Sequence, residues 1–552
     1  RDFKGGELIA FHSGGLGYET PAHSVTDSET QPPLKLGGNQ ALQLSGWVAA
    51  AGIMAAIHYK DITGKGQIVD VSKQESVTNI IRGETILHSY DVSRVARTRT
   101  KSGFSASPMF RCKDGYVSIS LSQEHWWQTL TDAPGAPPEL KAPEYGDAKS
   151  RAQNSTALEA LITSWFMQYT RSELFAIFNP LRLPCFGVNS MAEVTASAQY
   201  AARDFFVQQD HPVAGLVRQP GLVTRLTGVS RHKCRPAPLL GEHNADVLVN
   251  GWGSERTQTG ASKIKRGDNG RQLPLKGLRV LDFGWFYAAP HLGAWLGVLG
   301  AEVIRVESAT RVEYNRQAAN ARADGIPGID RSSIWNGVNF SKLGVTLNLS
   351  TDEGKALAIR LADKSDVVIE NFSAGVMDRL GLGHNKLSET NPRLITLSCA
   401  TLGQRGPEAK VSGLGPNIQV YAGLPFMTGY EGGPPGLGGG SWPDFVVGVI
   451  STFATLVALR DRERTGAGQH IDMAMAEVIT SMIPEAIMNF FWNGEEPERI
   501  GNHDPDMAPH NVYRAQGFDQ WVAISVSNDD EWRSMCEVMG LPELAEDPRF
   551  VD

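Results

Sequence analysis

The chain has 552 residues, more than one packed core normally holds, so two or three domains are expected. Hydrophobic residues make up 41% and charged residues 20%, which excludes a mostly disordered protein, and a net charge of −8 argues against a nucleic-acid binder that works through bulk positive charge. The five cysteines are widely spaced without a CxxC pair, so neither a disulfide framework nor a zinc cage is indicated, and a cytoplasmic location is expected.

The first predicted elements of the chain recur in its second half. Residues 46–77 match residues 448–479 without a gap, at a constant offset of 402. Each segment predicts an apolar helix, a TGxGQ turn whose glycines allow positive φ, and then a strand. Farther along, residues 107–121 parallel residues 510–526. The sequence therefore contains two copies of one fold.

The composition also predicts where the copies begin and end. Copy one is assigned to residues 1–249 and is followed by a polar linker, 250–273, rich in Gly, Ser and Thr. The large domain of copy two is assigned to residues 274–480 and the start of its small domain to residues 481–552. Because copy one enters partway through the repeat and copy two stops within it, both copies are expected to be incomplete in this chain.

Copy two opens with alternating strands and helices. This pattern predicts an α/β fold with a parallel, doubly wound sheet, whose ligands bind at the carboxyl ends of strands. The turn at 284–290 does not fit GxGxxG, so a dinucleotide-dependent dehydrogenase is disfavoured. The apolar run at 446–459 is too short to span a bilayer and predicts a buried helix, so a membrane is not expected among the partners of the protein. The expected strands are 278–283, 302–307, 366–372 and 393–400, with helices at 289–299 and 352–364.

Several cationic and amide side chains lie on or shortly after these strands. A protein with net negative charge has to gather positive charge locally if it binds a polyphosphate. The cluster therefore predicts a site for an anionic ligand, although each cation alone fits a solvated surface residue as well. Its members are Arg305, Arg311, Lys342, Asn371 and Arg379.

Five ordered segments of the chain resemble the family III (CaiB/BaiF-type) CoA-transferases, a family that includes the α-methylacyl-CoA racemases. The resemblance implies two tandem copies of a Rossmann-like large domain plus a smaller α+β domain, interlocked as a pseudo-dimer, with a homodimer as a further option. It also implies coenzyme A or acyl-CoA and a small carboxylic acid as substrates, with no metal and no permanently bound cofactor. The segments are 278–307, 366–383, 397–407, 460–477 and 499–509.

The resemblance also assigns residues that contact CoA. The family's ENFxxGxxxRLG block places Asn371, Phe372 and Arg379 near the adenine and phosphates. The rest of the expected contacts with CoA or substrate are Phe286, Tyr287, Ala288, Arg305, Arg311, Lys342 and Trp442.

Asp444, in GGGSWPDFVVG, matches the nucleophile of the family. An aspartate has a reference pKa of about 3.9, so it is expected to be ionised at neutral pH without a partner base. The start of the following helix adds a positive dipole end and free N–H groups that can hold an oxyanion. On residue type alone, an ordinary helix cap fits as well. Leu42 occupies the equivalent position in copy one, so one working site per chain is expected.

Two alternative functions remain open beside CoA transfer. The racemases of the family use a His-Asp pair, and the matching residues here are Pro416 and Asn417, which exchange no proton at neutral pH, so racemisation is disfavoured. The second alternative is a CoA-binding protein without catalytic activity.

Aromatic residues near the predicted site suggest a narrower substrate. Aromatic faces bind methylated cations with about 0.5–2 kcal/mol per contact, and Trp285, Tyr421 and Tyr430 belong to this group, although such rings also pack cores or cover a pantetheine arm. A fused chain with one nucleophile is similar to the dimethylsulfoniopropionate CoA-transferase/lyase form of the family. That similarity implies transfer from acetyl-CoA coupled to dimethyl sulfide release, with Tyr421, His503 or Asp504 as the base.

Overall fold

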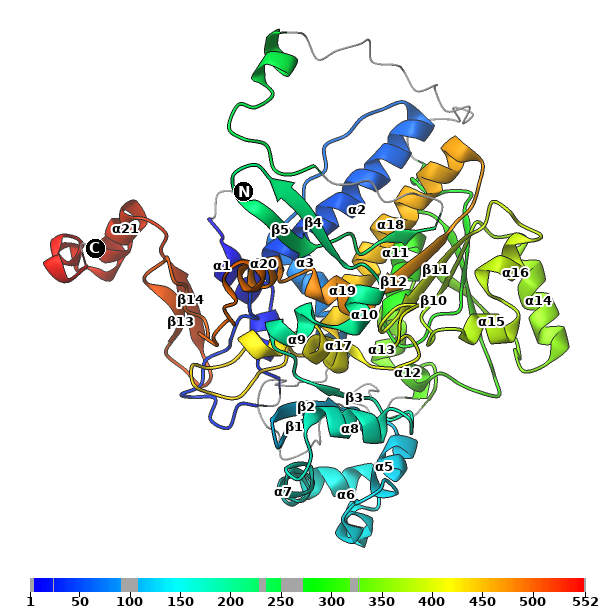
Figure 1. Ribbon diagram of the computed structural model, residues 1–552, viewed down its shortest axis with the longest axis horizontal. Coiled ribbons are helices and arrows are strands. Elements are labelled where there is room, and N and C mark those ends of the chain that lie inside the picture. The colour runs from blue at the N-terminus through cyan, green and yellow to red at the C-terminus, as the bar shows by residue number, and fades with distance from the viewer. Residues whose placement is uncertain are drawn as a thin grey trace.

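The computed structural model describes residues 4–22, 24–90, 108–227, 235–249, 272–317, 326 and 328–550. The predicted linker at 250–273 therefore lies almost entirely outside the described residues. A seven-stranded sheet occupies the body of the molecule, and a smaller helical unit with its own sheet extends from it (Figure 1).

The large sheet has the strand order β6-β12-β11-β10-β7-β8-β9. Its six strands from copy two are parallel, and their order is that of a doubly wound nucleotide-binding fold, which confirms the predicted α/β class. Copy one contributes β6, which pairs antiparallel with the edge strand β12. The strands are β6 (Arg225–Leu226), β7 (Arg279–Asp282), β8 (Glu302–Glu307), β9 (Lys342–Thr346), β10 (Val367–Glu370), β11 (Ile395–Ala400) and β12 (His470–Ala474).

Helices cover both faces of this sheet. Successive strand residues point to opposite faces, so Val280 joins the apolar cluster that contains Leu292 of α11, while Leu281 joins the cluster that contains Ala358 of α14. The sequence pattern of short apolar strands thus produces two cores. The helices of copy two are α11 (Ala288–Val298), α12 (Tyr314–Gln317), α13 (Ser333–Val338), α14 (Asp352–Ala362), α15 (Val376–Leu380), α16 (His384–Ser388), α17 (Gly415–Tyr421), α18 (Trp442–Thr465), α19 (Met475–Thr480) and α20 (Pro484–Asn493).

The matching segments of the two copies form two long helices that pack against each other, α2 (Gln40–Thr63) and α18 (Figure 1). Each helix ends at a glycine of the predicted TGxGQ turn, Gly64 with φ 73° and Gly466 with φ 79°, as expected for a left-handed helix end. By length and composition both helices could cross a membrane, but most of α18 is buried inside the protein and α2 lies along it.

The second pair of matching segments forms hairpins in both copies. In copy one the hairpin belongs to a three-stranded sheet covered by helices with a separate apolar core. In copy two the hairpin and the following helix project from the body (Figure 1). In copy one these elements are β1 (Met109–Cys112), β2 (Gly115–Ile119), β3 (Cys185–Gly187), α5 (Glu124–Thr131), α6 (Ala148–Gln153), α7 (Ser155–Phe166) and α8 (Arg171–Phe178). In copy two they are β13 (His510–Arg514), β14 (Trp521–Ser525) and α21 (Asp529–Met539).

The strand predicted after the turn forms in only one copy. In copy two it is β12, whereas residues 67–72 of copy one form no strand, and Ile68 is 94% exposed. A strand needs a neighbouring strand to satisfy its backbone, and the described part of copy one supplies none there. The remaining elements of copy one are α1 (Glu7–Ser13), α3 (Lys73–Ile80), α4 (Arg82–Ser89), α9 (Met191–Thr195), α10 (Ala198–Ala202), β4 (Phe206–His211) and β5 (Gly215–Pro220).

Candidate active site

The turn after β7 lies where the strand order of the sheet reverses, and side chains hold it in place. The backbone N–H of Trp285 donates to Oδ1 of Asn371 (2.7 Å), and Nδ2 of Asn371 donates back to the Trp285 carbonyl (2.7 Å). Asn315 donates to the carbonyl of Phe286, whose φ of 60° is unusual for a bulky residue. Asn371 therefore shapes this turn through its side chain, and Phe286 projects from a constrained backbone.

Two of the predicted phosphate-binding cations are neutralised inside the protein. The ammonium group of Lys342 donates to Asp282 (2.8 Å), and Arg305 pairs with both Asp282 (3.3 Å) and Glu313 (2.5 Å). Burial lowers the pKa of Lys342 to about 8, against the attraction of Asp282, which raises it. Glu313 in turn accepts from the N–H of Phe286 (2.8 Å). Arg305 and Lys342 therefore support the turn from within and do not present free charge to a ligand.

The other two cations remain at the surface, and one of them, Arg311, lies beside an aromatic ring. The guanidinium of Arg311 lies 5.0 Å from the ring centre of Trp285, and this ring meets that of Phe372 edge to face at 6.4 Å. Arg379 is exposed on α15, which follows the loop that carries Asn371 and Phe372. The carboxyl ends of β7 and β10 therefore carry an exposed face of aromatic rings and guanidinium groups, which suits a nucleotide with phosphates.

The same turn is packed against the start of α18. Tyr287 meets Phe445 with 5.5 Å between ring centres, and His291 meets the same ring at 5.0 Å. Ala288 is buried as the first residue of α11, so it contributes packing at this contact. Phe445 is the neighbour of Asp444, which places the predicted nucleophile at the end of this row of contacts.

Asp444 is the third residue of α18 and is 7% exposed. Burial raises the pKa of its carboxyl group to about 7, although its own backbone N–H opposes the shift. The expectation that Asp444 is fully ionised at neutral pH is therefore wrong for the free protein. In the part of the chain that the structure describes, no cationic side chain pairs with this carboxyl group, and Pro443 supplies no N–H beside it.

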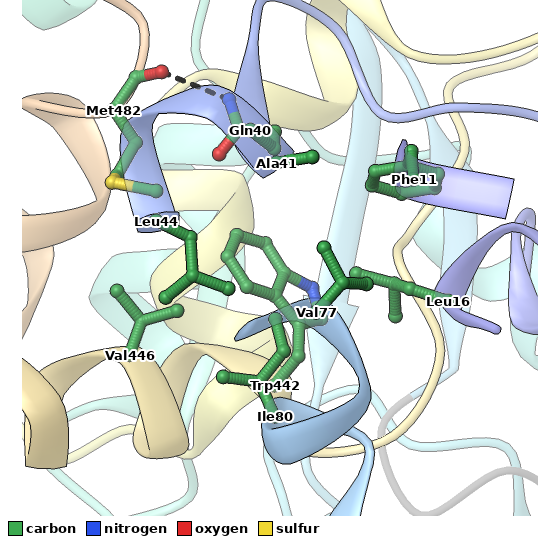
Figure 2. A pocket seen from close by; sticks show the side chains of 10 residues that line it. All are labelled: Phe11, Leu16, Gln40, Ala41, Leu44, Val77, Ile80, Trp442, Val446 and Met482. Carbon is green, nitrogen blue, oxygen red and sulfur yellow. Dashed lines mark hydrogen bonds between the residues drawn. The ribbon is translucent and has the colours of Figure 1, made fainter. Parts of the chain in front are cut away.

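Trp442 is placed differently from its prediction as a substrate contact. It is 1% exposed and lies in a narrow apolar pocket between the copies, near Leu44, Val77 and Ile80 of copy one (Figure 2). Residues two apart on a helix point about 200° apart, so Trp442 and Asp444 face different sides of α18. Trp442 therefore packs the two copies together.

The residues considered for other chemistry also have structural contacts. Asn417 is fully buried and binds Ser120 (2.6 Å) and the carbonyl of Ser118 (3.2 Å), joining copy two to the small sheet of copy one. Tyr421 donates to Glu408 (2.6 Å), and burial raises the pKa of its hydroxyl, which makes it a poor base. His503 is exposed and bonds Asn511.

Sequence reasoning missed the acidic partners of the buried cations. Asp282 follows the apolar pair Val280 and Leu281 at the end of β7, and this pattern predicts a buried carboxylate, which requires a cation nearby. Glu313 lies in a loop and carries no comparable signal.

Comparison with known proteins identifies the family of the chain. The model of CoA-transferase family III matches the chain twice, at residues 17–244 and 275–552. A probable CoA-transferase of Mycobacterium tuberculosis is 29% identical over 91% of this chain, and the chain spans 62% of that relative. An acetyl-CoA:oxalate CoA-transferase of Acetobacter aceti is 37% identical over 50% of this chain and 70% of its own. The crystal structure of a CaiB/BaiF family protein from Brucella suis is 34% identical with a TM-score of 0.47, covering 51% of this chain and 73% of that one. The chain therefore belongs to CoA-transferase family III.

Proposed function

We propose that this chain transfers CoA from an acyl-CoA donor to a carboxylic acid at one site, with Asp444 as the nucleophile. The observation that carries the proposal is the position of its buried carboxyl group. It lies at the start of the core helix α18, which contacts the turn after β7 through Tyr287 and Phe445. Arg311, Arg379 and Phe372 follow the neighbouring strands β8 and β10, and we assign CoA contacts to them.

The reaction is a sequence of carbonyl exchanges. One oxygen of Asp444 attacks the thioester carbon, the CoA thiolate leaves, and a mixed anhydride forms. The thiolate then attacks the aspartyl carbon, which releases the donor acid and leaves an aspartyl-CoA thioester. The acceptor carboxylate attacks the aspartyl carbon of that thioester, expels the thiolate and forms a second anhydride. The thiolate then attacks the acceptor acyl carbon of this anhydride, which gives the acceptor-CoA thioester and restores the Asp444 carboxylate. No proton is gained or lost overall.

We propose a small dicarboxylic acid as the acceptor. Relatives of this chain are named for CoA transfer involving oxalate, D-citramalate and glutarate, each at least 34% identical over about half of this chain.

The aromatic residues do not form the cage that a sulfonium substrate would need. Arg311 already lies over the ring of Trp285, Trp442 is packed between the copies, and Tyr421 is bonded to Glu408. Dimethylsulfoniopropionate cleavage is therefore not part of this proposal. Incubation with that compound and acetyl-CoA, followed by a headspace assay for dimethyl sulfide, tests the choice.

The test of the proposed function is an adduct on one residue. Acyl-CoA followed by hydroxylamine should convert Asp444 to a hydroxamate that peptide mass spectrometry locates. Asp444→Asn should abolish both adduct and transfer, while Asp461→Asn on the same helix should leave them unchanged. Transfer at full turnover by Asp444→Asn would overturn the proposal.

A second test uses pH. Because the carboxylate is the attacking form and burial holds the pKa of Asp444 near 7, the rate of adduct formation at low acyl-CoA should rise about tenfold per pH unit below 7 and level off above it. A flat profile from pH 5 to 8 would contradict this reading of the site.

A further inference from the structure

The carboxyl group of Asp444 faces a glycine, Gly415, which is the first residue of α17. A Cβ atom at Gly415 would lie 2.7 Å from Oδ2 of Asp444, closer than Cβ atoms approach other atoms in folded proteins. The backbone of Gly415 is not in the left-handed region, so its conformation does not demand glycine. What demands glycine here is the space beside Oδ2.

Copy one repeats the elements around this position in the same order. α1, the 3-10 helix η1 (Leu16–Glu19), α2 and α3 correspond to α17, η5 (Leu424–Met427), α18 and α19. α1 and α17 each have seven residues, and each leads to a left-handed glycine that starts the next element, Gly15 with φ 97° and Gly423 with φ 85°. The first residues of the two short helices, Glu7 and Gly415, therefore occupy equivalent positions.

The carboxylate lies on a different helix in each copy. Copy two has Gly415 on the short helix and Asp444 on the long one, whereas copy one has Glu7 on the short helix and Leu42 on the long one. The Glu7 carboxylate accepts from the backbone N–H of Ala41 (2.9 Å) and from that of Leu42 (3.0 Å). In each copy one carboxyl group lies at the start of the long helix. In copy one it accepts from two N–H groups there, and in copy two it lies against Gly415, which has no side chain.

We propose that Gly415 is a positioning residue that keeps one oxygen of Asp444 open to acylation, and that Glu7 fills the corresponding space in copy one. This inference rests on the proposed function. When Oδ2 bonds to an acyl carbon, the substituents of that carbon lie close to Oδ2. A Cβ atom at position 415 would lie within the same short distance of Oδ2. Glycine therefore leaves room for the anhydride, and the side chain of Glu7 removes that room in copy one.

Gly415→Ala tests the role in copy two. Alanine is well accepted at the start of a helix, so the variant should fold, with a melting temperature lowered only by the strain of a Cβ that meets Oδ2. Its acyl-CoA affinity should stay within about twofold, because CoA contacts the turn after β7, while the rate of hydroxamate formation at Asp444 should fall at least about 100-fold. A loss confined to the acylation step, with binding intact, distinguishes positioning from a general structural role. The matched control is Gly46→Ala in α2, where a Cβ would meet nothing within 4 Å.

The outcomes separate the two proposals. Wild-type acylation by Gly415→Ala, or an equal loss of acyl-CoA binding, overturns the role of Gly415 while the loss of adduct in Asp444→Asn still supports the proposed function. Persistence of the adduct in Asp444→Asn overturns both.

A second pair of variants tests the equivalence in copy one without touching the catalytic copy. Glu7→Gly should lower the melting temperature, because the first N–H groups of α2 lose their acceptor. Adding Leu42→Asp should recover most of that loss, since it returns a carboxyl group from the other side of the same space. Strictly additive effects of the two substitutions would show that the positions do not share one space and would overturn the proposed correspondence.

Discussion

At the scale of single residues, the proposed nucleophile Asp444 makes folding less favourable when its carboxyl group is ionised. Burial raises the pKa of Asp444 from 3.8 to about 7, so the folded chain binds more protons than the unfolded chain between these values. The free energy of unfolding therefore falls as pH rises from about 4 to about 7 and is constant above that window with respect to this group.

Asp444→Asn should remove that dependence. The variant should be more stable than the wild type by up to about 4 kcal/mol at pH 8, with the difference vanishing near pH 4, because one pKa unit corresponds to about 1.4 kcal/mol. Urea unfolding at a series of pH values measures the difference, and Asp352→Asn at an exposed position serves as the control. Equal stability of wild type and variant across pH 4–8 would show that the carboxyl group is not buried as described.

The same scale shows what sequence alone could predict about the site. Asp444 was predicted from its motif and Asn371 from its place after a strand. The structure puts Asn371 against the turn after β7 and Asp444 in the first turn of α18, which packs on that turn through Phe445. The ion pairs that Arg305 and Lys342 make with acidic residues could not be predicted in this way, because Asp282 and Glu313 come close to them only in the folded sheet. Residue type and spacing indicate that a cation is near a site, but only the fold decides whether its charge is free.

At the scale of elements, periodicity predicted most helices and strands because their apolar faces are local properties of the sequence. Strand β12 and residues 67–72 show the limit. Both follow the same long helix and the same turn, yet only β12 has a neighbouring strand on either side. Pairing is a tertiary property, so an identical local pattern gave two different structures.

This difference predicts unequal effects of matched substitutions. Val69 and Ile471 are equivalent in the repeat, but Val69 is 36% exposed and Ile471 is fully buried in β12. In this chain, Val69→Asp should change the free energy of unfolding by no more than about 0.5 kcal/mol, whereas Ile471→Asp should cost more than about 4 kcal/mol by burying an unpaired carboxylate. Thermal unfolding of the two variants compares their stabilities directly. Equal losses of stability would contradict the difference in burial between Val69 and Ile471.

At the scale of the whole molecule, buried charges join the two copies. Arg203 of copy one is fully buried and donates to Asp472 (2.7 Å) and Glu477 (2.7 Å) of copy two, at the strand where β6 also pairs with β12. The side chain of Gln199, on helix α10 just before Arg203, donates to the carbonyls of Leu402 (2.7 Å) and Arg405 (2.9 Å). Such contacts fix how copy one lies against the sheet that carries the site, and we propose that the copies act as one interlocked pair.

Arg203→Met should therefore destabilise the interface between the copies more than the loss of an exposed ion pair would. Removing Arg203 leaves the buried carboxylate of Asp472 without this cation and leaves Glu477 with the longer contact to Arg225 (3.4 Å), which typically costs about 3–5 kcal/mol. Arg464→Met, whose pair with Asp461 is at the surface, should cost at most about 1 kcal/mol. Hydrogen exchange should accelerate first in β6 and β12, because the lost contacts lie there. Replacing all four charges together, as Arg203→Met/Arg225→Met/Asp472→Asn/Glu477→Gln, should recover much of the loss, since no charge of this cluster then remains buried. If Arg203→Met instead leaves exchange in β6 and β12 unchanged, the copies are held together by their apolar contact along α2 and α18 and not by this cluster of charges.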